Sequence, residues 1–127
     1  MPALSNQRIQ IGKEGEDFVA TWLQEQGYTI CAANYRYAGG EIDLIAKKNE
    51  ILAFVEVKNR RSHYFNLSEV ITRSKQRKIT HVARRYIVEY GMSLYVYRFD
   101  VALIEGIGKN RNISYIENAF TDEWIFK

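Results

Sequence analysis

Two charged residues lie two positions apart at the end of an apolar run. The run LAFVEVKNRR (52–61) carries Glu56 and Lys58 and then continues into Arg60 and Arg61. A run rich in Leu, Phe and Val is typical of a buried strand, where charged groups are costly unless they are paired or bound to a metal. Because residues two apart on a strand share a face, Glu56 and Lys58 are expected to act together.

A second carboxylate, Asp43, lies in the preceding apolar run EIDLIAKK (41–48). If the two runs pair as neighbouring strands, with Asp43 on the same side as Glu56, two carboxylates and one ammonium group converge. Glu16 could join them from an amphipathic helix, because it falls in the middle of that helix's apolar face.

Alternation assigns the strand residues to two faces. In the run 51–58, one face holds Ile51, Ala53, Val55 and Val57, and the opposite face holds Leu52, Phe54, Glu56 and Lys58. In the run 41–48, one face holds Glu41, Asp43 and Ile45, and the opposite face holds Ile42 and Leu44. Both faces of the run 51–58 are apolar before Glu56, which indicates a central strand whose carboxyl end opens onto a polar site.

Such a cluster suits a hard divalent cation. Two or three carboxylates, with backbone carbonyls or waters, make an oxygen site for Mg²⁺ or Mn²⁺. A metal held there can bind a phosphodiester oxygen and lower the pKa of a bound water. Lys58 would then orient the attacking water and stabilise the transition state.

Each of these residues also has a simpler interpretation. Glu56 and Lys58 could form an ion pair at a strand end, which contributes little to stability. Asp43 could be a hydrogen-bonded acid close to a turn. Glu16 could favour the positive end of a helix dipole, although its place on the apolar face argues against this. The strand-turn-strand context is what favours the metal site.

The elements that position these residues follow from hydrophobic periodicity and turn residues. The sequence predicts, in chain order, a helix over about 7–26, strands over 28–37, 41–48 and 51–58, a polar loop over about 59–68, a helix over about 71–90, a strand over 94–104 and a short edge strand over 112–117. Short turns between the first three strands favour an antiparallel meander. The predicted fold is α/β, a mixed β-sheet flanked by helices in the order α-β-β-β-α-β, in a single domain over 1–127.

The composition is that of an ordinary folded protein. The chain has 127 residues, of which 46% are hydrophobic and 26% charged. A single cysteine, Cys31, excludes an internal disulfide, and no apolar stretch is long enough for a signal sequence or a membrane span. A cytoplasmic protein that does not enter a membrane is therefore expected.

Positive charge is concentrated in one part of the chain. Residues 58–85 hold 9 of the 18 Lys and Arg residues and only one acid, Glu69. This span could be a solvated helix face, or it could be a surface that binds a polyanion such as nucleic acid.

Several motifs along the chain resemble those of a known family. They are GKEGEDFVATWL, NYR (34–36), GGEIDLIA (39–46), FVEVKNR (54–60), Lys75 with the helix after it, and RFDV (98–101). The chain resembles, most strongly over 12–101, the YraN family of small bacterial proteins. That family is similar to the PD-(D/E)xK nuclease superfamily and to the archaeal Holliday-junction resolvases.

The resemblance implies a restriction-endonuclease-like core and a set of roles. Asp43 and Glu56 would bind the metal, with the carbonyl of Val57 beside them. Lys58 would serve the water and the transition state, and Glu16 would be a further ligand or a supporting acid. The superfamily's Pro before the Asp is replaced by Ile42.

Three functions follow as hypotheses. The first is a Mg²⁺- or Mn²⁺-dependent endonuclease that hydrolyses phosphodiester bonds in branched or otherwise structured DNA. The second is a catalytically silent protein that binds DNA or RNA through the same basic surface. The third is an interaction protein that uses the aromatic-rich stretch 86–99.

The expected phosphate contacts are Arg36, Arg60, Arg61, Arg73, Lys75, Arg77 and Lys78. Resolvase-like enzymes often act as symmetric dimers, so the resemblance also implies a homodimer.

Overall fold

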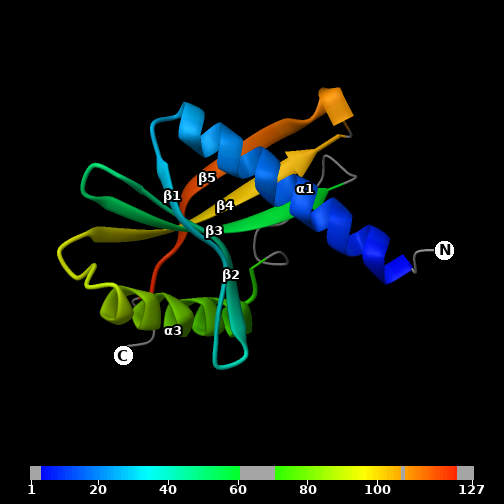
Figure 1. Ribbon diagram of the computed structural model, residues 1–127. Coiled ribbons are helices and arrows are strands. Elements are labelled where there is room, and N and C mark those ends of the chain that lie inside the picture. The colour runs from blue at the N-terminus through cyan, green and yellow to red at the C-terminus, as the bar shows by residue number, and fades with distance from the viewer. Residues whose placement is uncertain (1–3, 61–70, 107, 123–127) are drawn as a thin grey trace.

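The structure is a computed structural model that describes residues 4–60, 71–106 and 108–122. Its elements are α1 (Leu4–Glu25), β1 (Thr29–Tyr37), β2 (Gly40–Lys48), β3 (Ile51–Arg60), α3 (Arg73–Glu89), β4 (Val96–Glu105), the 3-10 helix η1 (Gly108–Asn110) and β5 (Asn112–Phe120). The strands form one sheet in the order β1-β2-β3-β4-β5. Only β3 and β4 are parallel, and the other neighbours are antiparallel (Figure 1).

The predicted α/β fold with a mixed sheet and flanking helices is confirmed. The first three strands form the expected antiparallel meander. The edge strand β5 runs to Phe120, three residues further than predicted. A polar loop was predicted over 59–68. Asn59 and Arg60 instead belong to β3, and residues 61–68 lie outside the described residues.

Helix α1 covers one face of the sheet. Its fully buried Val19 and Leu23 lie four residues apart, and they pack against Leu44 and Val55 from β2 and β3. The helix ends at Glu25, and Gly27, two residues later, has a φ of 95°, a conformation that glycine adopts without strain. None of the described helices combines the length and the apolar composition that a membrane span needs.

Helix α3 covers the opposite face (Figure 1). Thr72 caps its first turn, because the Thr72 hydroxyl accepts a hydrogen bond from the amide of Lys75 at 3.2 Å. Val82 and Tyr86 point inward and pack with Phe54 and Phe99 from β3 and β4. The aromatic stretch 86–99 is therefore partly core.

The predicted alternation holds in β3 and fails in β2. In β3, Ala53 and Val55 pack on the α1 side, and Leu52 and Phe54 pack on the α3 side. The remaining buried residues of the two packing clusters lie in the neighbouring strands and helices.

In β2, the prediction that Ile42 shares a face with Leu44 is wrong. Ile42 packs on the α3 side together with Ile45, whereas Leu44 packs on the α1 side. The alternation breaks at Asp43, which is where β2 leaves β3: their pairing ends at Leu44 and Val55, and the hairpin tip beyond it packs against α3. Asn34 of β1, between the Ala33–Leu44 and Tyr35–Ile42 pairs, has a left-handed backbone (φ 54°).

The tip of the β1–β2 hairpin lies against α3. A side chain added at Gly40 would place its Cβ 2.7 Å from Val82 Cγ2 and 3.2 Å from the carbonyl oxygen of Lys78. This position therefore needs glycine for close approach. The contact holds the hairpin beside the first half of α3 (Figure 1).

A buried polar cluster occupies the α1 side of β4. Asp100, whose side chain is 0% exposed, accepts hydrogen bonds from the Arg98 guanidinium at 2.8 to 3.0 Å. It also accepts one from the Tyr115 hydroxyl at 2.6 Å and one from the Asn118 amide at 2.9 Å. Arg98 donates in turn to the Tyr28 hydroxyl. Because every oxygen of this carboxylate is satisfied, the cluster is a structural tie between β4, β5 and the start of β1.

Candidate functional site

Asp43 lies where β2 and β3 stop pairing. Their backbone pairing ends at Leu44 and Val55. Beyond it, Asp43 Oδ2 accepts a hydrogen bond from the Val57 amide at 2.8 Å. The side chain thus takes the place of a strand partner, which holds the carboxylate at the point where β2 and β3 diverge.

Glu56 and Asp43 form a carboxyl pair. Burial, the charge of Asp43 and a hydrogen bond with its carboxyl raise the pKa of Glu56 to about 8. Burial also raises the pKa of Asp43, although the hydrogen bond from Val57 opposes the shift. At neutral pH and without a cation, the Glu56 carboxyl therefore keeps its proton and donates it to the Asp43 carboxylate.

This pair predicts a falling stability at alkaline pH. Between the ordinary glutamate pKa of about 4.5 and the folded value of about 8, the folded chain binds more protons than the unfolded chain. The free energy of unfolding should therefore decrease as pH rises through this window, by on the order of 2–4 kcal/mol. Urea unfolding at a series of pH values from 5 to 9, with a chelator present to remove metal ions, measures this change in the free energy of unfolding.

Glu56→Gln should remove most of this slope, because its amide is neutral at every pH. Glu25→Gln, at the exposed end of α1, is the matched control and should leave the slope unchanged. A Glu56→Gln protein with the wild-type slope would contradict the raised pKa of Glu56.

Lys75 is the cation that reaches this pair. Its Nζ lies 3.9 Å from Glu56 Oε1, and its charge favours the ionised form of Glu56 without overcoming the effect of burial. Lys58 acts on Glu56 in the same direction but more weakly, and it is exposed at the end of β3. The structure therefore brings Lys75 closer to the carboxyl pair than the residue predicted for that place.

A pocket of about 250 Å³ opens over the carboxyl pair. It lies between the hairpin tip and the first half of α3, and its described lining is Gly39, Gly40, Glu41, Asp43, Glu56, Lys75, Lys78 and Ile79. Lys58 and Glu16 are not part of that described lining. The pocket thus has acids on its β2 and β3 side and lysines on its α3 side.

Glu16 lies near the carboxyl pair without joining it. Burial raises its pKa, a hydrogen bond with Asn34 opposes the shift, and the charges of Asp43 and Glu41 add to it. The hydrogen-bond partner of Glu16 is thus on β1. Both Glu16 and Asp43 feel the negative charge of Glu41, so several acids cluster in this part of the structure.

The donor set of this region fits Mg²⁺ or Mn²⁺ held by two carboxylates. Within the described part of the chain, no group of three or more His, Cys, Asp and Glu side chains is placed to hold a metal ion. Mg²⁺ is often bound by only one or two carboxylates, with waters and substrate oxygens completing its shell. A cation at Asp43 and Glu56 would replace the proton that they share, and it would relieve their mutual repulsion.

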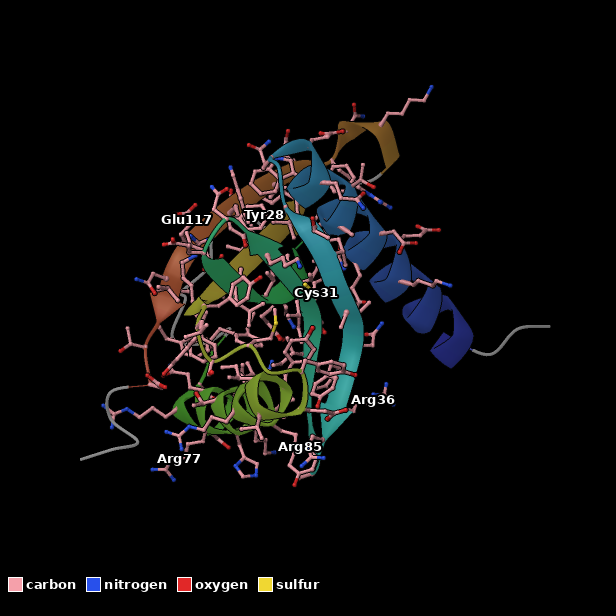
Figure 2. All side chains as sticks on the ribbon, turned by 60° about the vertical axis from the view of Figure 1, so that its left-hand side comes forward. Tyr28, Cys31, Arg36, Arg77, Arg85 and Glu117 are labelled. Carbon is pink, nitrogen blue, oxygen red and sulfur yellow. The ribbon has the colours of Figure 1, made fainter. Side chains whose placement is uncertain are left out.

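Four of the seven predicted phosphate contacts lie at the start of α3. Arg73, Lys75, Arg77 and Lys78 occupy its first two turns, and Figure 2 shows Arg77 on the outer side of this helix. Arg36 lies on the hairpin, where its Nε is 3.6 Å from Glu41 Oε2. Arg60 is the last residue of β3. Arg61 lies outside the described residues.

Two site residues were missed by sequence reasoning. Lys75 was expected to contact phosphate only, and Glu41 was given no role beyond its strand face. Glu41 carries a usable signal, because it lies two residues from Asp43 on one strand. The proximity of Lys75 to Glu56 has no local signal, since it depends on where α3 begins in space.

A comparison with known protein families shows which family the chain belongs to. The model of the Uncharacterised protein family UPF0102 matches residues 15–104. The chain belongs to this family. The predicted membership of the YraN family is thereby confirmed, and the matched segment includes Asp43, Glu56 and Lys75.

Relatives of the UPF0102 chain match it over nearly their whole length. A UPF0102 protein of Desulfosudis oleivorans is 44% identical over 116 residues, which are 91% of this chain and 93% of the relative. One of Alkaliphilus metalliredigens is 44% identical over 87% of this chain and 96% of the relative. A UPF0102 protein of Chloroherpeton thalassium is 40% identical over 91% of this chain and 96% of the relative.

Proposed function

We propose that the protein is a metal-dependent endonuclease that hydrolyses phosphodiester bonds in DNA, with branched or otherwise structured DNA as its expected substrate. The observation that carries this proposal is the partly buried carboxyl pair of Asp43 and Glu56, which shares a hydrogen bond in the lining of a pocket. Carboxyl groups that need a proton between them are suited to exchange it for a divalent cation.

The charge around the pocket supports a nucleic-acid substrate. The first turn of α3 contains no acidic residue and carries Arg73 and Lys75. Cations at the amino end of a helix oppose the helix dipole, so this placement does not serve helix stability. Phosphate groups are attracted both by these side chains and by the helix end. The substrate backbone would therefore lie along the start of α3, above the carboxyl pair.

Each residue of the site has a distinct task in the hydrolysis. A bound Mg²⁺ or Mn²⁺ supplies polarisation of a phosphodiester oxygen. Asp43 and Glu56 would hold the ion, and the Val57 amide keeps Asp43 in place. As the family resemblance implies, Lys58 would orient the water whose oxygen bonds to phosphorus as the bond to the leaving sugar oxygen breaks. One proton of the water passes to solvent, and the sugar oxygen takes a proton from solvent and leaves as a hydroxyl.

The experiment that tests this function uses the wild-type chain. Four-way junction, flap, single-stranded and linear duplex DNA are incubated with Mg²⁺ or Mn²⁺, and with chelator as the control. We expect cleavage of at least one substrate that depends on the metal and is absent with chelator. Mn²⁺ should also raise the melting temperature of the protein, because it binds the folded state alone.

A different result would contradict the proposal that the protein is an endonuclease. A wild-type protein that binds DNA or RNA tightly and in a salt-dependent way, without cleavage and without stabilisation by Mn²⁺, is a nucleic-acid-binding protein. The exposed basic residues of α3 would account for that behaviour by themselves.

A further inference from the structure

Lys75 lies at the boundary between the pocket and solvent. Its side chain is 48% exposed, whereas that of Glu56, 3.9 Å from its ammonium group, is 17% exposed. The ammonium group therefore lies beside the partly buried carboxyl, on its solvent side. From this position it can also meet a group that approaches the pocket from solvent.

The backbone of Lys75 is held firmly while its side chain is long. The Thr72 hydroxyl accepts a hydrogen bond from the Lys75 amide at 3.2 Å, and the Gln76 side chain donates to the Ile71 carbonyl at 3.2 Å. Ile71 is itself buried against β4. A four-carbon stem on a fixed backbone lets the ammonium group change partners without movement of the helix.

We propose that Lys75 exchanges partners: in the metal-free protein it lies beside Glu56 and balances the negative charge of the Asp43–Glu56 pair, and it contacts the substrate phosphate once that pair holds the metal. This role rests on the proposed function. A divalent cation beside Glu56 repels the ammonium group, and a phosphate at the pocket mouth attracts it. Lys75 is thus a competitor of the metal before the substrate arrives and a phosphate ligand afterwards.

The proposal is tested by measuring two quantities on Lys75→Met. Without DNA, its affinity for Mn²⁺ should rise by about 3- to 10-fold in calorimetric titration, because a repelling charge close to the site is gone. Single-turnover cleavage by the same variant should fall by about 10- to 100-fold, because a phosphate contact is lost. A role in folding alone would not move these two quantities in opposite directions.

Two further variants serve as controls for the position and the presence of the charge. Lys78→Met removes the same charge from the lining of the same pocket but leaves the Lys75–Glu56 pair, so its Mn²⁺ affinity should change by less than about twofold. Lys75→Arg keeps the charge and should retain the wild-type Mn²⁺ affinity. Thermal unfolding of each variant confirms that it is folded.

The outcomes separate this role from the proposed function. If the wild type cleaves DNA but Lys75→Met binds Mn²⁺ no more tightly than Lys78→Met, the exchange of partners is wrong and the endonuclease stands. If Lys75→Met cleaves at the wild-type rate, Lys75 does not contact the phosphate. A wild type that neither binds Mn²⁺ nor cleaves DNA overturns the proposed function and this role with it.

Discussion

Asp43→Asn is expected to lower the rate of metal-dependent DNA cleavage by about 100- to 1,000-fold while leaving the fold intact. The Asn side chain keeps an oxygen that can accept the hydrogen bond from the Val57 amide. It loses the negative charge that a divalent cation requires. The expected loss corresponds to roughly 3–4 kcal/mol of transition-state stabilisation. Single-turnover kinetics and titration with Mn²⁺ measure the two effects.

The stability of Asp43→Asn separates chemistry from folding. Because the substitution removes one of two adjacent, partly buried acids, the metal-free variant should be at least as stable as the wild type at pH 8. Glu41→Gln removes a neighbouring acid of the same pocket and should lower cleavage much less, since no hydrogen bond joins Glu41 to the carboxyl pair in the described structure. Cleavage that survives both Asp43→Ala and Lys58→Ala would show that the site lies elsewhere.

The carboxyl pair could be predicted from the sequence because its geometry is local. Asp43 and Glu56 lie on consecutive antiparallel strands joined by a tight turn, so alternation and turn length together bring them close. The same reasoning failed for Ile42, because it assumes an unbroken two-residue period. The period breaks at Asp43, where β2 leaves β3 and the hairpin tip packs against α3, and no pattern within β2 reveals it.

The cation of the site could not be predicted in the same way. Lys58 is on the strand that carries Glu56, so a local argument selects it. Lys75 comes from a helix that follows the segment 61–70, and its approach to Glu56 depends on the packing of Val82 and Tyr86 against the sheet. Four basic residues occupy the first two turns of α3, and their spacing alone does not say which of them turns toward the pocket.

The buried cluster around Asp100 is a second feature that sequence reasoning did not interpret. The motif RFDV contributed to the family resemblance, yet no role followed for its two charged residues. Their partners come from Tyr28, Tyr115 and Asn118, which are distant in the chain. A charge pair inside a strand is a signal of such a network, but its partners depend on the tertiary structure.

Asp100→Ala is expected to destabilise the protein by about 3–5 kcal/mol, the largest effect on stability that we predict for a single substitution. The carboxylate is fully buried and accepts hydrogen bonds from three residues. Its removal leaves the Arg98 guanidinium, the Tyr115 hydroxyl and the Asn118 amide without this buried acceptor. Urea unfolding at pH 7 measures the loss, with the exposed Asp17→Ala as a control that should change stability by less than about 0.5 kcal/mol.

The double variant Arg98→Met and Asp100→Leu tests the reason for that loss. If the destabilisation of Asp100→Ala comes mainly from an uncompensated buried charge, removing both charges should recover part of it, because apolar side chains of similar size can replace a buried ion pair. The recovery should be incomplete, since the Tyr115 hydroxyl and the Asn118 amide still lack their acceptor. A double variant less stable than Asp100→Ala would mean that Arg98 contributes chiefly through its packing and its hydrogen bond to Tyr28, rather than as the counter-ion of Asp100.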